Sequence, residues 1–321
     1  MEYGLKPLGR EKFWLWALLT PTFIGLIFGA LGSVIATVLL SFAKWDLLTT
    51  PTWAGTVNYV NLFKDPKILV SLTNTIKFTT IYVPGVVIVS LFVAVLMNRK
   101  IRGVGFFRTA YFLPAVTSAV ATALVWQMIY GNDTGILNFI LERLGMHDVC
   151  WLCGEYVMYS VIIVNIWGAV GEGMIIFLAG LTAIPREYYE AAEMDGANGF
   201  HQFFRITVPL ISPSIFFQTL ISTINAFQAY DYIYILTRRG QGDSSVPVVV
   251  FSIYRNAWNF FNYGGASAQA IELTAIVAVL MAFRSEEHTS ELQSHSEISY
   301  ARKSTRLNSS HIQKSRMPSS A

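Results

Sequence analysis

The sequence predicts an all-α membrane protein, a polytopic helix bundle with about six transmembrane helices. Of the 321 residues, 53% are hydrophobic and only 13% are charged, whereas soluble proteins carry about 25% charged residues. The mean hydropathy is +0.47. A spanning α-helix needs about 20 apolar residues. Six segments have the composition and length to cross a bilayer: 14–42, 69–97, 109–130, 156–182, 209–236 and 266–283.

The six segments differ in how clearly they can be interpreted as spans. Segment 14–42 is too long for the apolar core of a signal peptide, and no small-residue cleavage pattern follows it. Pro84 and Pro114 fall in the second and third segments, where neighbouring helices can satisfy the backbone groups that proline frees. Segment 266–283 is the shortest and contains Glu272. It stops abruptly where the composition changes, so we expect it to be cut short.

The composition changes abruptly after residue 283. Residues 284–321 are rich in serine and lack apolar periodicity. Such a segment cannot bury a core, so we expect it to be disordered. The run KSTRLNSSHIQKSRMPSSA also resembles translated sequencing-adapter text, which indicates a non-native tail. The predicted organisation is one membrane domain, 1–283, followed by this tail.

The composition also argues against other classes of protein. A net charge of +3 is too small to indicate nucleic-acid binding. The two cysteines, Cys150 and Cys153, are too few for a disulfide framework. Their spacing is compatible with a local disulfide and with an unbonded pair, and we expect the unbonded pair.

The basic residues of the connecting segments predict the orientation, because cytoplasmic loops are enriched in Lys and Arg. With the N-terminus in the cytoplasm, the inside segments hold nine Lys and Arg in 50 residues, and the outside segments hold seven in 80. The strongest contribution comes from the connection between the second and third spans. Its basic residues are Arg99, Lys100, Arg102 and Arg108. We therefore expect a cytoplasmic N-terminus.

The connection between the fourth and fifth segments, 183–208, contains signals for two short helices. Pro185 suits a helix start, and Gly196 permits a sharp turn after that helix. Four residues fall on one face of the first helix: Tyr188, Ala191, Ala192 and Asp195. Three phenylalanines form an apolar stripe on the second helix: Phe200, Phe203 and Phe204. The pattern predicts a helix–turn–helix at the cytoplasmic membrane surface that presents small and acidic residues.

This connection carries a recognisable motif: Glu-Ala-Ala, three residues, Gly, nine residues, Ile, one residue, Leu-Pro. The chain has Glu190, Ala191, Ala192, Gly196, Ile206 and Pro209 at these places, with Val208 in place of Leu. On this motif the chain resembles the permease subunits of binding-protein-dependent ATP-binding-cassette (ABC) importers. The runs FLAGLTAIPREYYEAAEMDGA and GFFRTAYFLPAV resemble the sugar-permease branch, the maltose-permease-like group.

The resemblance implies a fold, a set of partners and a role for the connection. The chain would have the ABC importer permease fold and lie in the inner (cytoplasmic) membrane. It would form half of the translocation pathway for a sugar, together with a second permease, two ATPase subunits and an extracytoplasmic solute-binding protein. The connection 183–208, called the coupling loop below, would dock onto an ATPase. The docking residues would be Glu190, Ala191, Ala192, Asp195, Gly196, Ile206 and Pro209.

The chain lacks the motifs of a nucleotide-binding or metal-dependent enzyme. No Walker A sequence occurs, so we expect ATP to be hydrolysed by the partner and no cofactor to be bound here. No H-E-x-x-H motif or clustered Cys and His residues indicate a metal site. We predict no catalytic residue and no metal ligand.

Polar residues inside the apolar segments are the candidates for the solute pathway, because polar groups in a membrane are expensive and often functional. These candidates are Asn165, Glu172, Asn225, Gln228, Tyr230 and Asp231. Each is also compatible with contacts to neighbouring helices or to the partner permease. Two other functions stay open at this point. One is an ABC permease for a non-sugar solute, and the other is a membrane-embedded enzyme that uses Glu172 or Glu272 as an acid or base.

Overall fold

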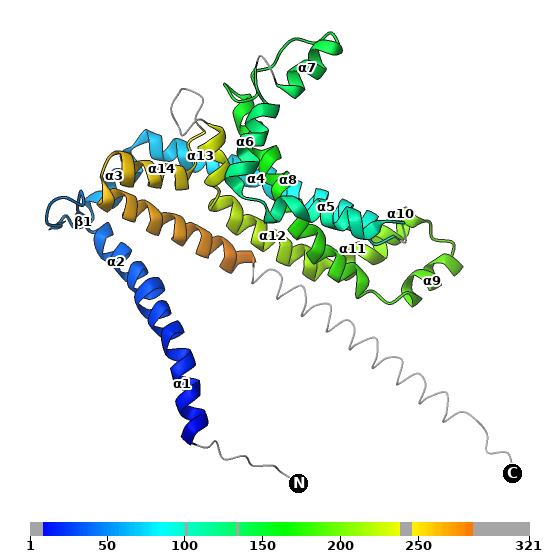
Figure 1. Cartoon of the computed structure of the whole chain (residues 1–321), viewed down its shortest axis with the longest axis horizontal. Helices are drawn as coiled ribbons and strands as arrows, with labels where there is room; N and C mark the ends of the chain where they lie inside the picture. The colour runs from blue at the N-terminus through cyan, green and yellow to red at the C-terminus, as the bar shows by residue number, and fades with distance from the viewer. Residues whose placement is uncertain (1–8, 100–101, 133–134, 238–245, 285–321) are drawn as a thin grey trace, which may run out of the picture. The chain divides into compact units, whose positions relative to one another are not determined.

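The computed structural model describes residues 9–99, 102–132, 135–237 and 246–284. The predicted disordered tail, apart from Arg284, lies outside these ranges, as does Lys100. The chain divides into two compact units after Thr274, and the elements discussed below lie in the first unit, except for the end of the helix Tyr263–Arg284 (Figure 1). In the described residues the one sheet is a short ribbon, in which β1 (Ala43–Lys44) pairs antiparallel with β2 (Thr52–Trp53).

Helices dominate the described residues and confirm the predicted all-α membrane fold. Four helices are long and apolar enough to cross a membrane, and two bent pairs raise the number to six if each pair is one span. The single helices are Lys12–Ser41, Pro66–Met97 (α4), Tyr156–Thr182 (α8) and Tyr263–Arg284. The bent pairs are Val104–Val116 (α5) with Ala119–Ile129 (α6), and Gly199–Leu210 with Ser212–Phe227 (α12).

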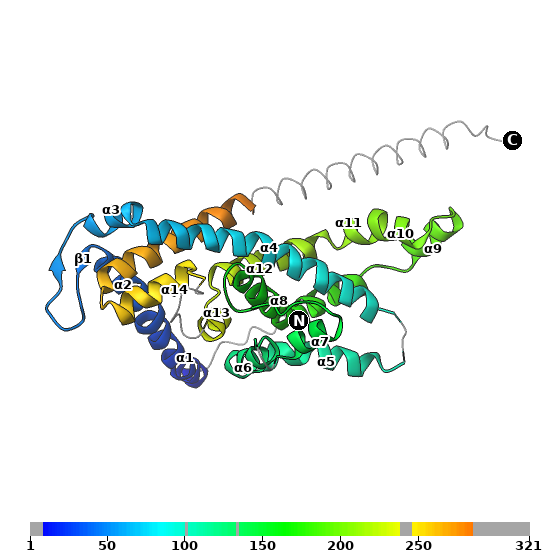
Figure 2. The same ribbon diagram turned by 90° about the horizontal axis from the view of Figure 1, so that it is seen from above.

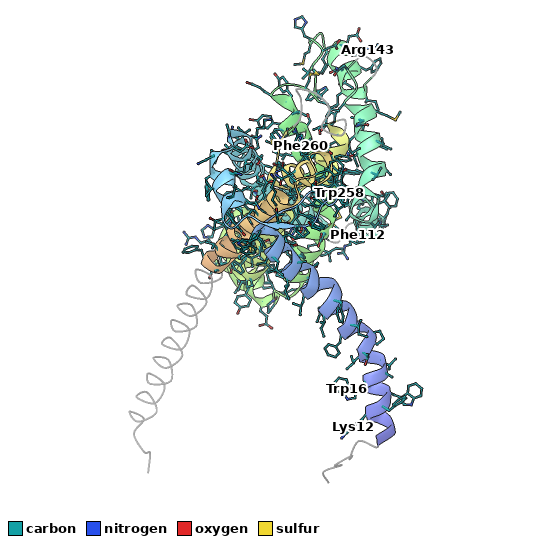
Figure 3. The ribbon with its side chains drawn as sticks, turned by 90° about the vertical axis from the view of Figure 1, so that its left-hand side faces the viewer. Lys12, Trp16, Phe112, Arg143, Trp258 and Phe260 are labelled. Carbon is teal, nitrogen blue, oxygen red and sulfur yellow. A yellow bond between two sulfur atoms is a disulfide. The ribbon has the colours of Figure 1, made fainter. Side chains whose placement is uncertain are left out.

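The first span is nearly continuous and makes few contacts. It comprises α1 (Gly9–Ile24), a π-helical stretch (Gly25–Leu31) and α2 (Gly32–Ser41). None of its most apolar stretch is buried within the chain. Figure 3 shows Lys12 and Trp16 on α1, away from the other helices of this unit. A helix with this much exposed apolar surface fits a membrane and not water.

The third span is broken instead of running straight over 109–130. The axes of α5 and α6 meet at 101°. Pro114 cannot donate to a carbonyl one turn earlier, and the Thr117 hydroxyl donates to the Pro114 carbonyl oxygen at 2.8 Å. Thr117 and Ser118 both have extended backbone angles. Local side-chain hydrogen bonds thus compete with the helix at this point.

The fifth span is also interrupted, in contrast to the continuous segment 209–236 that hydropathy outlines. The chain bends by 68° at Ile211, before α12. A second break at 228–230 separates α12 from α13 (Asp231–Leu236). With 16 residues, α12 is about 24 Å long, which is less than the thickness of a bilayer core of about 30 Å.

Helix α8 is the centre of the packing. It contacts α4, α5, α12 and α13, and Figure 2 shows α4, α8 and α12 side by side. Glycines make these approaches close. A Cβ on Gly171 would clash with the Tyr111 carbonyl oxygen and lie 2.8 Å from the Phe112 Cα, both in α5. A Cβ on Gly173 would lie 2.8 Å from the Ser90 Cβ of α4 and 3.2 Å from the Gln218 Nε2 of α12.

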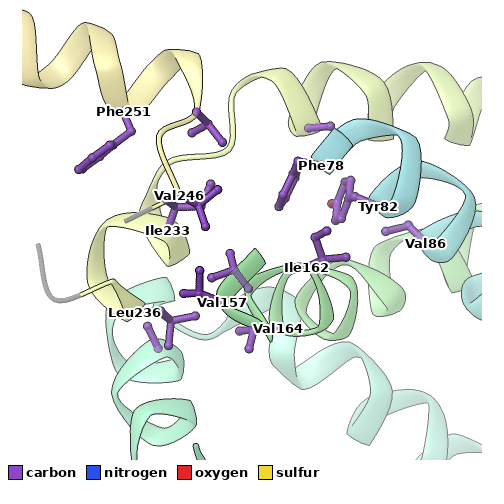
Figure 4. Close-up of a cluster of buried hydrophobic side chains, with 14 of the residues drawn as sticks. Phe78, Tyr82, Val86, Val157, Ile162, Val164, Ile233, Leu236, Val246 and Phe251 are labelled. Carbon is purple, nitrogen blue, oxygen red and sulfur yellow. The ribbon is translucent and has the colours of Figure 1, made fainter. Parts of the chain in front are cut away.

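Two apolar clusters lie along α4 and α8. The first cluster joins α4 and α8 to α13 and α14 (Val249–Tyr254), as Figure 4 shows. Its members include Phe78, Tyr82, Val86, Val157, Ile162, Val164, Ile233, Leu236, Val246 and Phe251. The second lies toward the C-terminal ends of α4 and α8 and includes Met97, Met174, Phe177, Leu181 and Ile211. Dispersion and close packing in these clusters hold the helices together.

The described connections outside the spans contain short helical elements and local hydrogen bonds. They contain α3 (Val57–Lys64), α7 (Ile136–Arg143) and a π-helical turn after α14 (Arg255–Asn259). After β1, the Asp46 carboxylate accepts hydrogen bonds from the hydroxyl and amide of Thr49, which lower the pKa of Asp46. Cys150 and Cys153 are joined by a disulfide with their Cα atoms 5.5 Å apart, so the expectation of an unbonded pair was wrong.

The packing at Gly171 generates the first testable prediction. Replacing Gly171 with Ala should lower the midpoint of thermal unfolding of the purified protein, because α5 backbone occupies the space of the new Cβ. Overpacking of this kind destabilises by about 1–3 kcal/mol. The control is Gly105→Ala in α5, where a Cβ meets no heavy atom within 4 Å. Equal midpoints for the two variants would contradict the predicted close approach.

Candidate functional site

The coupling loop begins with a short helix whose side chains are all accessible. Helix α9 spans Glu187–Met194 and contains no buried residue. Its first turn holds Glu187 and Glu190, which interact favourably with the positive end of the helix dipole. Pro185 lies just before this helix, as the sequence predicted. Figure 1 shows α9 beyond the C-terminal end of α8.

Gly196 ends this helix by the turn that its position predicts. Its φ is +77°, a left-handed conformation that glycine adopts without strain. The Gly196 amide donates to the Glu193 carbonyl oxygen at 3.0 Å, and the Ala197 amide donates to the Ala192 carbonyl oxygen at 2.9 Å. These two bonds form a Schellman motif, which fixes the direction of the chain as it leaves α9.

A second helical arm follows and returns the chain to the bundle. It consists of α10 (Gly199–Gln202), η2 (Phe203–Thr207) and α11 (Val208–Leu210). The Asn198 side chain caps α10 by accepting from the His201 amide at 2.8 Å. The Tyr189 hydroxyl lies 2.9 Å from the Thr207 Oγ1 and so joins α9 to the arm. The predicted helix–turn–helix is present and is held by these local bonds.

The predicted docking residues fall into two groups within this loop. On α9 and its turn, Glu190, Ala191, Asp195 and Gly196 are exposed, and Ala192 is half-buried. On the returning arm, Ile206 is half-buried and Pro209 is exposed. Large apolar side chains accompany the first group: Tyr188, Met194 and Phe200 are 53%, 89% and 73% exposed. An exposed patch of this kind is typical of a protein–protein contact site.

Two of the pathway candidates lie on one face of α8. Asn165 and Glu172 are seven residues apart, or about two helical turns. The Asn165 side chain is half-buried and donates to the Val161 carbonyl oxygen at 2.9 Å. The Glu172 side chain is exposed, although its residue lies well inside a span.

The remaining candidates lie around the break after α12. Asn225 and Gln228 are exposed near its C-terminal end, and Asp231 is the exposed first residue of α13. Tyr230 is different, because its ring packs 5.2 Å from both Tyr234 and Tyr254. Tyr230 is therefore part of an aromatic cluster that joins α13 to α14.

The structure adds two tyrosines that sequence reasoning missed. Tyr82 of α4 interacts electrostatically with Glu172 of α8 and with Tyr232 of α13. The Tyr232 side chain is hydrogen-bonded to Thr122 of α6 and also interacts with Asp231. The Tyr232 hydroxyl lies against α8, 3.0 Å from where a Cβ on Gly168 would be. A phenol inside an apolar segment is a weak signal, and nothing in the sequence relates positions 82 and 232.

No group of three or more His, Cys, Asp or Glu residues that could hold a metal ion occurs in the part of the chain that the structure describes. Glu272, which the enzyme alternative invoked, lies on the last described helix and is half-buried. The candidate site, over the described residues, is thus a set of exposed polar and apolar surfaces.

The chain resembles known transport proteins over most of its length. Residues 60–285 match the family described as binding-protein-dependent transport system inner membrane component. The chain is 35% identical over 271 residues to the probable ABC transporter permease protein YesP of Bacillus subtilis (strain 168), covering 83% of this chain and 87% of YesP. It is 31% identical over 229 residues to the trehalose/maltose transport system permease protein MalF of Thermococcus litoralis, covering 71% and 76%.

A solved structure shares the fold. The crystal structure of a bacterial ABC transporter involved in the import of the acidic polysaccharide alginate includes a chain that matches with a TM-score of 0.76 and 24% identity. The match covers 87% of this chain and 96% of that chain. Similarity of fold alone would not show membership in the family, but the family match and the two relatives do. The chain therefore belongs to the family of inner membrane components of binding-protein-dependent transport systems, and it is an ABC transporter permease and not an enzyme.

Proposed function

We propose that the chain forms half of the translocation pathway of an ABC importer for a sugar or a related solute. The observation that carries this proposal is the coupling loop, an exposed helix and turn whose shape is fixed by the Schellman bonds and the Tyr189–Thr207 contact. The sugar assignment is supported by relatives such as MalF, whose name gives trehalose and maltose as its solutes.

The proposed machine contains more subunits than this chain. A second permease completes the pathway, two ATPase subunits hydrolyse ATP in the cytoplasm, and an extracytoplasmic binding protein delivers the solute. In this proposal, an ATPase contacts Glu190, Ala191 and Asp195, and their exposure on this chain supports that role. The half-buried Ala192 leaves room for close approach to the α9 backbone.

In this mechanism the coupling loop transmits movement from the ATPases to the spanning helices. Its first end continues from α8, and its second end leads through α11 into α12. When ATP draws the two ATPases together, displacement of α9 is transmitted to both helices, because local hydrogen bonds keep the loop from deforming. Since α8 and α12 carry Asn165, Glu172 and Asn225, such a movement would alter the solute pathway directly.

The charge of Glu190 provides a direct test of docking. Glu190→Lys should leave the permease in the membrane but reduce solute uptake by about tenfold or more, together with ATPase co-purification. Like charges at an interface oppose binding by several kcal/mol, and tenfold corresponds to about 1.4 kcal/mol. The matched control is Glu142→Lys, the same change on the eight-residue helix α7. Normal uptake and co-purification in Glu190→Lys would remove the main support for the docking role.

The turn at Gly196 provides a second test of coupling. Gly196→Val should reduce transport at unchanged membrane levels, because a left-handed conformation costs a non-glycine residue about 1–2 kcal/mol. The Ala197 amide should also exchange with solvent faster, since the Schellman bond is weakened. Gly199→Val is the control, because Gly199 has ordinary backbone angles and open space at its Cβ. The coupling role of the turn fails if the two variants transport equally.

The proposed orientation is tested by labelling single cysteines after Cys150 and Cys153 are replaced by Ser. With a cytoplasmic N-terminus, an impermeant maleimide added to intact cells should label Asn132→Cys and should label Glu190→Cys only after permeabilisation. The reason is that α8 crosses the membrane between the two positions. Labelling of position 190 in intact cells would overturn the topology and the ATPase docking together.

A further inference from the structure

Glu172 occupies a position that lipid cannot stabilise. It lies about 24 Å from the start of α8 and about 15 Å from its end, at a rise of 1.5 Å per residue, so it is deep in the membrane. Its side chain is exposed on this chain. An acidic residue at the centre of a spanning helix opposes insertion by about 2.5–3.5 kcal/mol. The side chain must therefore face water or another protein, and not lipid.

The surroundings of Glu172 are polar. Gly168, four residues earlier on the same face of α8, is approached by the Tyr232 hydroxyl, which lies 3.0 Å from where its Cβ would be. Tyr82 interacts electrostatically with Glu172 and with Tyr232. Asn165 lies one further turn along this face. Together these groups form a polar strip along α8 at membrane depth.

Asp231 lies at the other end of the same group of residues. It interacts electrostatically with Tyr232 and Tyr230 and is exposed. It directly follows the non-helical residues 228–230, which the chain reaches after only about 24 Å of α12. Irregular backbone at membrane depth is tolerated where it is buried in protein or lines a water-filled cavity. Asp231 is exposed and so is not buried in this chain, which fits the second of these environments.

Neither carboxylate is neutralised by a cation of the described residues. Glu172 and Asp231 have no ion pair in this part of the chain. Lys77, a cation inside α4, lines a different cavity of about 770 Å³ together with Glu155 and Tyr159. The Arg108 guanidinium of α5 donates to the Met97 carbonyl oxygen at 3.0 Å. Within the described residues, no cation offsets a negative charge on either side chain of the strip.

We propose that Glu172 and Asp231 make this subunit's side of the pathway an anionic filter, which admits neutral and cationic sugars and excludes acidic ones. This inference rests on the proposed function. Charged rings of this kind set the sign of the solutes that a pore conducts, and low-dielectric walls strengthen their field. Carboxylates also accept hydrogen bonds from sugar hydroxyls. The relatives show that both kinds of sugar occur, since MalF is named for trehalose and maltose and the alginate importer handles an acidic polysaccharide.

The test measures the electrostatic potential on the strip without knowing the solute. Asn165→Cys is introduced after Cys150 and Cys153 are replaced by Ser, and the complete importer is placed in proteoliposomes. The probes are a cationic and an anionic methanethiosulfonate of similar size, with modification of this subunit followed by mass. The ratio of the reaction rate with the cationic probe to that with the anionic probe should be about tenfold higher, or more, at this cysteine than for a free thiol in solution. Glu172→Gln with Asp231→Asn should remove most of this preference.

Controls make each outcome decisive. Glu155→Gln is the matched control, because Glu155 lies at the start of α8 and makes no side-chain cap bond, and it should keep the preference. If the double variant fails to assemble, Glu172→Gln and Asp231→Asn are measured separately. Each should lower the ratio of cationic to anionic reaction rates in part. Equal reaction of both probes, no reaction with either, or a ratio unchanged by the substitutions overturns the filter.

A parallel uptake measurement separates the filter from the proposed function. Trehalose and maltose, the neutral sugars named for MalF, are each compared with a derivative carrying a carboxylate at C6, loaded to saturation on the binding protein. The acidic derivative should be imported at least about tenfold more slowly, and the double variant should narrow the difference. If no sugar is imported while the cationic probe is still preferred, the proposed function is contradicted. The negative potential on the strip is then still supported. Equal import of both sugars contradicts the filter.

Discussion

The close approach of α8 to its neighbours is the constraint on which the rest of the structure depends. In a bilayer, apolar side chains gain little by leaving lipid, so helices associate through close packing and interhelical hydrogen bonds. Gly171 lets the α5 backbone reach α8, and Gly173 lets α4 and α12 reach it. Because α4, α5 and α12 all meet α8, the apolar clusters and the polar strip are arranged around this one helix.

The helices that follow the breaks in the third and fifth spans, α6 and α13, contact each other and share hydrogen bonds. The Gln127 side chain of α6 donates to the Ile235 carbonyl oxygen of α13 at 2.6 Å. Thr122 bonds to Tyr232, and its hydroxyl lies 3.1 Å from the Thr117 Oγ1. If the third and fifth spans were unbroken helices, their backbone N–H and C=O groups at these positions would be paired within each helix. The interhelical hydrogen bonds to backbone groups would then be unnecessary. The breaks bring polar side chains to membrane depth, where a pathway for a hydrophilic solute requires them.

The coupling loop has a different physical basis. Its shape comes from bonds between residues close in sequence, namely the Schellman bonds at Gly196, the Asn198 cap and the Tyr189–Thr207 contact. No residue of α9 is buried, so the loop does not need the bundle to hold its form. A surface that is locally rigid and left uncovered is suited to transmit force between a partner and the two helices that it connects.

The sequence alone determined the features that depend on composition or on neighbouring residues. Hydropathy indicated a helical membrane protein because the bilayer acts on each segment separately, and the spacing from Pro185 to Gly196 predicted the short helix and its turn. Tertiary structure decided the rest. The interactions of Tyr82 with Glu172 and Tyr232, of Thr122 with Tyr232 and of Gln127 with Ile235 join residues more than 40 positions apart in the sequence. A helix is broken, or a charge tolerated, only where another segment supplies the hydrogen bond or the water, and hydropathy contains no information about that segment.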